Sequence, residues 1–124
     1  MELLSFRLLS KKFKDELIFR ESKLNIGNFL SHTWDIIIEL DKHYNCYECK
    51  FSSFSLKRIH IDKMLASKHK SDNISIFLVV LHQLSFINQK LKIIQGNTSD
   101  EKYDELLNEF KIISLEDFLE GNPF

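Results

Sequence analysis

The chain has 124 residues, 44% of them hydrophobic and 28% charged, and its formal net charge is −1. This length predicts a single domain over residues 1–124, and the balance of apolar and charged residues excludes an intrinsically disordered chain. No apolar run approaches the roughly 18 residues of a membrane helix, and the first residues lack the basic and apolar regions of a signal peptide.

The N-terminal part of the sequence predicts a helix followed by strands. Residues 2–17 carry apolar side chains over one broad helical face. Residues 17–26 have a mixed pattern that fits a strand, and Gly27-Asn28 is a turn signal. The β-branched run around Ile37 favours a strand over residues 32–40.

The middle of the sequence predicts two more strands on either side of a helix. Residues 45–52 form the first strand, and Ser55 is placed to cap a helix over residues 56–69. Polar residues 71–73 end that helix. Residues 74–82 are the most apolar stretch, which predicts an interior strand covered on both faces.

The C-terminal part is less regular. Residues 83–95 fit a helix or a strand equally well. The remainder predicts, in order, a loop, a helix, a short strand and a helical turn over residues 96–100, 101–109, 110–115 and 115–120. The whole order predicts an α/β fold with a mixed central sheet flanked by helices.

Three charged side chains fall on two neighbouring predicted strands. Asp35 lies on the first, and Glu48 and Lys50 lie on the second. Residues i and i+2 of a strand share a face, so Glu48 and Lys50 project side by side. Pairing through a turn at residues 41–44 would bring Asp35 close to both. Two carboxylates at one edge cost free energy unless a cation compensates them, and a divalent metal beside a lysine suits phosphodiester cleavage.

This constellation resembles the PD-(D/E)XK nuclease superfamily, which includes restriction endonucleases and Holliday-junction resolvases. The family pattern places an acid on one strand and Asp/Glu-x-Lys on the next, and here Glu48 follows Asp35 by thirteen positions. The predicted elements also match the restriction-endonuclease-like αβββαβ core of that superfamily. The proline that often precedes the first acid is replaced by Trp34.

The resemblance implies a Mg²⁺-dependent phosphodiesterase that cuts nucleic acid internally, DNA rather than RNA. Asp35 and Glu48 would bind Mg²⁺, with Mn²⁺ as a substitute, and the backbone carbonyl of Cys49 would be a further ligand. Lys50 would orient the attacking water or stabilise developing negative charge. Glu2, at the head of the first helix, matches a further acid found in the family.

A basic stretch follows the second strand. The resemblance implies that the helix after Lys50 faces the substrate, so Lys57, Arg58 and Lys63 are candidates for contacts with phosphates. The same side chains would also suit a merely solvated helix face. The net charge of −1 neither favours nor excludes nucleic acid as a partner.

The spacing Cys46-x-x-Cys49 invites a zinc or redox interpretation. One pair is only half of a zinc site, and strand geometry puts the two thiols on opposite faces. Buried apolar roles are therefore predicted for both, and the histidines show no convergent spacing. Two cysteines are too few for a disulfide scaffold, so a cytoplasmic, reducing location is expected.

Two other interpretations stay open on sequence alone. Glu48 and Lys50 would be solvated neighbours on a simple surface hairpin. Alternatively, the chain would be a catalytically inactive nuclease-fold module that binds nucleic acid or a protein partner. The short chain also suggests a homodimer, or a part of a larger protein or complex, in which two sites cut opposite strands.

Overall fold

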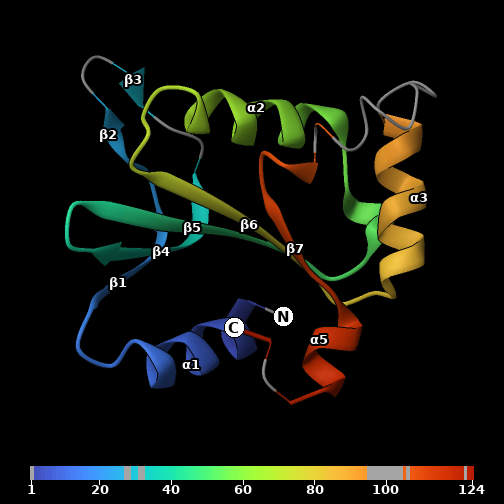
Figure 1. The fold of residues 1–124 in the computed structure, drawn as a ribbon, viewed down its shortest axis with the longest axis horizontal. Coiled ribbons are helices and arrows are strands. Elements are labelled where there is room, and N and C mark those ends of the chain that lie inside the picture. Colours follow the sequence, from blue (N-terminus) through green and yellow to red (C-terminus); the bar gives the residue numbers. More distant parts are fainter. Residues whose placement is uncertain (1, 27–28, 31–32, 95–104, 106, 122) are drawn as a thin grey trace.

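A mixed sheet of five strands runs through the part of the chain that the structure describes, with helices on both faces (Figure 1). The structure is a computed structural model that describes residues 2–26, 29–30, 33–94, 105, 107–121 and 123–124. The strands lie in the order β1-β4-β5-β6-β7, which are Leu17–Ser22, Trp34–Leu40, His43–Lys50, Ile74–Val80 and Lys111–Ile113. β1, β4 and β5 pair antiparallel, whereas β5, β6 and β7 pair parallel.

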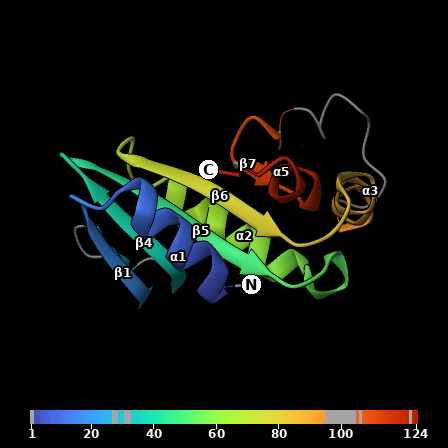
Figure 2. The same cartoon turned by 90° about the horizontal axis from the view of Figure 1, so that it is seen from below.

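Helices cover the sheet in two pairs, which Figures 1 and 2 show from perpendicular directions. Leu9 of α1 (Glu2–Lys12) and Phe118 of α5 (Leu115–Leu119) pack on one side, called here the α1 face. The opposite side, called the α2 face, is covered by α2 (Arg58–Lys68) and α3 (Leu84–Ile94). A separate two-stranded sheet pairs β2 (Asn25–Ile26) with β3 (Phe29–Leu30). No described helix is long and apolar enough to cross a membrane.

Alternation along the strands fills both faces. In β4, Ile36 and Ile38 pack on the α1 face and Ile37 packs on the α2 face. In β6, Val79 faces α1, while Leu78 and its alternating neighbours face α2. Burying an apolar side chain of this size stabilises the folded state by about 1.5–3 kcal/mol. The predicted interior strand at residues 74–82 is therefore confirmed, because β6 lies between β5 and β7 and is apolar on both sides.

The first predicted helix is shorter than expected and the strand after it is divided. α1 ends at Lys12, because Leu17 already pairs with Glu39 in the sheet. The predicted strand over residues 17–26 splits into β1 and β2. Glu21 adopts a φ of 48°, in the left-handed region that is uncommon for a residue other than glycine, and β1 ends one residue later.

The prediction that Ser55 caps the next helix is wrong. Ser55 ends a short 3₁₀ helix, η1 (Ser53–Ser55), and α2 begins only at Arg58 with Lys57 at its N-cap. The next residue, Leu56, is buried in the core of the α2 face, so the chain must turn inward before a helix can start. Within the stretch 83–95, which fitted either element, the structure describes helix α3 over Leu84–Ile94, whose Ile87 and Leu91 are one turn apart and fully buried.

The other predicted elements are found close to their expected bounds. Predicted strands at 32–40, 45–52 and 110–115 correspond to β4, β5 and β7, and the final helical turn corresponds to α5. The predicted turn at Gly27-Asn28 and the loop at 96–100 lie outside the described residues, as does most of the predicted helix at 101–109.

Candidate functional site

The β4–β5 hairpin brings the two predicted acids together. Its register pairs Ile36 with Tyr47 and Leu40 with His43, and Lys42 in the turn has a φ of 60°. The register ends at Ile36 and Tyr47, and just beyond it the side chains of Asp35 and Glu48 form a hydrogen bond. The antiparallel pairing predicted from sequence is therefore confirmed, but the turn is only residues 41–42, because His43 and Tyr44 already pair with β4.

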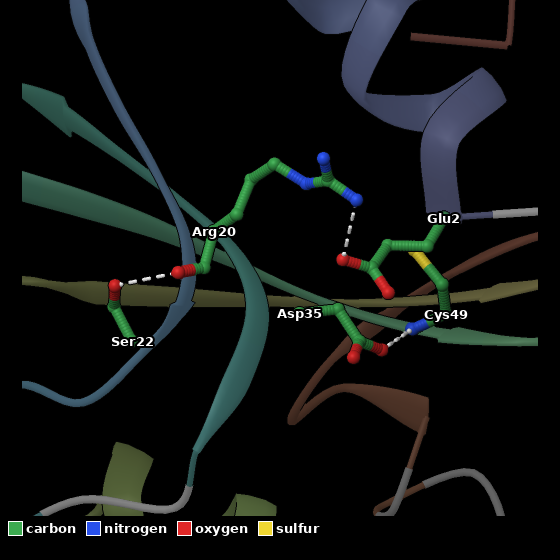
Figure 3. A network of polar contacts seen from close by, with 5 residues as sticks. All are labelled: Glu2, Arg20, Ser22, Asp35 and Cys49. Atoms are coloured by element: carbon green, nitrogen blue, oxygen red, sulfur yellow. Dashed lines mark hydrogen bonds and ion pairs between the residues drawn. The ribbon is translucent and has the colours of Figure 1, made fainter.

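Asp35 is held by its neighbours on β5. Its Oδ2 accepts a hydrogen bond from the backbone N–H of Cys49 at 2.7 Å, as Figure 3 shows. Burial raises the pKa of Asp35 from 3.8 to about 7, and a side-chain hydrogen bond with Glu48 and the charges of Glu48 and Glu2 act in the same direction. The bond from Cys49 opposes this shift, because it favours the carboxylate. Asp35 therefore keeps its proton to a higher pH than an ordinary aspartate does.

Glu2 joins the acids from another element. It is the first residue of α1, and its Oε1 accepts a hydrogen bond from Nη2 of Arg20 on β1 at 3.1 Å. The Arg20 guanidinium also lies over the ring of Phe6, 5.0 Å from its centre. Figure 3 shows Arg20 reaching across to Glu2 beside Asp35. Sequence reasoning missed Arg20, because its place beside Glu2 depends on the pairing of β1 with β4.

Glu48 and Lys50 occupy the end of an interior strand. Glu48 is only 5% exposed, and Lys50 is partly buried as the last residue of β5. Pairing of Glu48 with Leu78 and Lys50 with Val80 fixes the backbone of both on the β6 side. The alternative of a solvated surface pair does not fit a carboxylate as buried as that of Glu48, which needs compensation by partners.

The two cysteines lie apart, as predicted. Cys46 is in the core of the α2 face, and Cys49 packs against the α1 face. Burial raises the pKa of each thiol to about 12, so the thiolate that binds zinc or attacks a disulfide is disfavoured. Opposite faces also prevent the pair from sharing one metal ion.

Asp35 and Glu48 provide some of the ligands that a hard cation such as Mg²⁺ needs. Within the described residues, no group of three or more His, Cys, Asp or Glu side chains is arranged to hold a metal ion. Asp35 and Glu48 nevertheless supply two neighbouring carboxylates, and oxygen ligands of this kind are those that Mg²⁺ prefers. The pKa of Asp35 is raised first by burial and also by the neighbouring acids Glu48 and Glu2, and a divalent cation would favour the charged carboxylates.

The basic residues lie on the helix that follows the site. Lys57 and Arg58 are exposed at the start of α2, and Arg58 forms an exposed ion pair with Asp62 at 3.7 Å. Lys63 is also exposed, about 7.5 Å further along the helix than Arg58. Along the chain, Lys57 and Arg58 are therefore nearer to Lys50 than Lys63 is.

Comparison with known proteins identifies the fold. No family model matches this chain, and no curated protein matches its sequence. Among solved structures, it is similar to the small subunit (R.BspD6I2) of the heterodimeric restriction endonuclease R.BspD6I, with a TM-score of 0.55 and 13% sequence identity. The match covers 99% of this chain and 70% of that subunit. The chain therefore has a restriction-endonuclease-like fold, as the sequence predicted.

Proposed function

We propose that this chain is a metal-dependent endonuclease that hydrolyses phosphodiester bonds in nucleic acid, DNA rather than RNA. The observation that carries the proposal is the pair of Asp35 and Glu48, whose carboxyl groups share a hydrogen bond that contributes to raising the pKa of Asp35 to about 7. A buried acid pair destabilises a fold, so a site of this kind is a candidate for function. Its position in a restriction-endonuclease-like fold, with Lys50 two residues beyond Glu48, supports hydrolysis of nucleic acid.

The cofactor in this proposal is Mg²⁺, with Mn²⁺ as a substitute. Asp35 and Glu48 would hold it, together with the backbone carbonyl of Cys49. When bound, the cation would neutralise charge on the phosphate and make the attacking water more acidic.

The protein's own groups position and stabilise the reacting atoms. The N–H of Cys49 holds the Asp35 carboxylate in one orientation. The ammonium group of Lys50 orients the water or donates to a phosphate oxygen as negative charge develops. Glu2 adds a third carboxylate, whose charge Arg20 partly balances.

Contacts with the substrate backbone are assigned to α2. Lys57, Arg58 and Lys63 are exposed cations that would contact phosphates, which gives affinity without reading a base sequence. The structurally similar protein is one subunit of a heterodimeric restriction enzyme. We therefore propose that the active enzyme contains a second subunit, either another copy of this chain or a larger partner, so that two sites can cut opposite strands.

The test is cleavage of labelled single-stranded, duplex and branched DNA, and of RNA, with Mg²⁺ or Mn²⁺. Wild type is compared with Lys50→Ala and Glu48→Gln, and Glu39→Gln on the same hairpin is the matched control. Metal-dependent cutting that the first two variants lack and the control retains supports the proposal. No cutting by a folded protein would favour a catalytically inactive binding module, and cutting that survives both substitutions would refute this assignment of the site.

A further inference from the structure

Aromatic side chains gather just beyond Lys50. Phe51 follows it in the chain and is 72% exposed, and Phe54 in η1 is 79% exposed, the highest value among the exposed large apolar residues that the structure describes. Phe86, on α3, is 46% exposed. Figure 1 shows the green segment after β5 passing beside α3.

Three of the rings in this region form a continuous array. The ring of His82 stacks on Phe86, with centres 4.9 Å apart and planes 16° apart. The ring of His82 also lies 5.7 Å from that of Phe54, at an angle of 53°. We call Phe54, His82 and Phe86 the aromatic platform.

The platform is fixed by hydrogen bonds rather than by apolar burial. Nδ1 of His82 accepts from the backbone N–H of Ser53 at 3.2 Å, and the hydroxyl of Ser53 lies 2.8 Å from the same nitrogen. Ser53 is buried, so η1 is tied directly to the end of β6. The Glu116 carboxylate accepts from the N–H of Leu84 at 3.0 Å, which anchors the first turn of α3. The rings are thus held in place while Phe54 keeps most of its surface in solvent.

The platform lies next to the candidate active site. The N–H of Leu81, one residue before His82, donates to the carbonyl of Lys50 at 3.2 Å. Along the chain, Lys50 precedes η1, and Lys57 and Arg58 follow it. Exposed aromatic rings close in the chain to cations match single-stranded nucleic acid, whose unpaired bases stack on rings while its phosphates approach the charges.

We propose that the aromatic platform stacks against unpaired bases next to the scissile phosphate, and that the substrate contains a single-stranded segment. This inference rests on the proposed function, because it names the substrate class for the same site. Bases inside an uninterrupted duplex are already stacked on both sides, and they offer no free face to Phe54. Single strands, branch points and unpaired ends do offer one.

The experiment measures binding without cleavage. A single-stranded oligonucleotide carrying 2-aminopurine and a matched duplex are titrated with wild type in EDTA, following fluorescence and anisotropy. Phe54→Leu keeps an apolar side chain but removes the ring, whereas Phe54→Trp keeps a ring. Phe86→Ala is compared with Phe19→Ala, a similarly exposed phenylalanine on edge strand β1, 43% exposed against 46%.

The expected result is specific to rings and to single strands. Phe54→Leu and Phe86→Ala weaken single-strand binding about tenfold and reduce quenching of 2-aminopurine, while Phe54→Trp and Phe19→Ala bind as wild type does. Duplex affinity changes less than twofold in every variant. This outcome would support the platform even if the cleavage assay failed, so the two proposals can fail separately.

Two results would overturn the platform. One is single-strand binding by Phe54→Leu that equals wild type, whatever the cleavage assay shows. The other is a wild-type dimer in sedimentation that Phe54→Leu converts to monomer with no loss of stacking signal, because a second copy would then be what covers these rings.

Discussion

The apolar part and the acidic part of the β4–β5 hairpin have opposite effects on the stability of the fold. In the middle of β4 and β5, Ile36, Ile38 and Tyr47 are buried among apolar side chains and stabilise the sheet. Just beyond the last pair of that ladder, Asp35 and Glu48 share a side-chain hydrogen bond, and the pKa of Asp35 is raised to about 7, first by burial and then by Glu48. The two regions are neighbours in the same hairpin, and they differ in whether the side chains are apolar or acidic. The difference teaches that this fold keeps a destabilising acid pair directly beside its apolar core.

A substitution in the apolar part of the hairpin should have the largest effect on the free energy of unfolding. Ile38→Ala removes a fully buried side chain from the α1 face and should lower the free energy of unfolding by about 2–5 kcal/mol. Urea denaturation followed by circular dichroism measures this loss. Ile59→Ala, an exposed position on α2, is the control and should change stability by less than about 0.5 kcal/mol. Equal losses in the two variants would mean that the hairpin core is not where the stability resides.

A substitution in the charged part of the hairpin should remove nuclease activity and leave the fold intact. Lys50→Ala should reduce the rate of cleavage by about a hundredfold to a thousandfold, because one charge that stabilises the transition state is lost. Single-turnover kinetics on the best substrate measures the rate, and a melting curve checks folding. Lys42→Ala in the exposed hairpin turn is the matched lysine control and should cut normally. A comparable loss in Lys42→Ala would show that the effect is not specific to the site.

The pH dependence of stability can sharpen the comparison. The pKa of Asp35 is about 7 in the folded state against an ordinary value of 3.8, so between these values the folded state retains a proton that the unfolded state has released. Stability should therefore fall as the pH rises from about 4 to about 7, and Asp35→Asn should remove that fall. Because Asp35 is partly solvated, we expect the variant to be more stable at pH 8 by on the order of 1–3 kcal/mol.

Urea denaturation at pH 5 and pH 8 checks this sign, with Asp41→Asn in the exposed turn as the control. Adding Mg²⁺ at pH 8 should raise the melting temperature of wild type and leave that of Asp35→Asn unchanged. A fall in stability with pH that persists in Asp35→Asn would assign it to another group.

The smallest effect is expected at Arg20. Its ion pair with Glu2 is partly exposed, so Arg20→Ala should change stability by less than about 1 kcal/mol. Losing this cation leaves the charge of Glu2 unbalanced near Asp35, which should move the pH profile of cleavage upward. Arg20→Lys keeps the charge and should restore most of the wild-type profile. An unchanged profile in Arg20→Ala would mean that Arg20 serves only to hold α1.

Local patterns explain what could be predicted. β4, β5 and the short turn between them are neighbours in the chain, so the approach of Asp35 to Glu48 follows from side-chain alternation and a local pairing. The opposite faces of Cys46 and Cys49 follow from the same alternation. The predicted cap at Ser55 failed because the segment before α2 is set by tertiary contacts, namely the burial of Leu56 and the hydrogen bonds of Ser53 with the distant His82.

The sequence by itself determined the α/β class, the interior strands and the acid pair, since these depend on periodicity and on residues close along the chain. Only the tertiary structure decided that Arg20 contacts Glu2 and that Phe54, His82 and Phe86 form one platform. Those contacts join separate elements, and no local pattern encodes them. Their geometry comes from the order of strands in the sheet and from helices packing on its two faces.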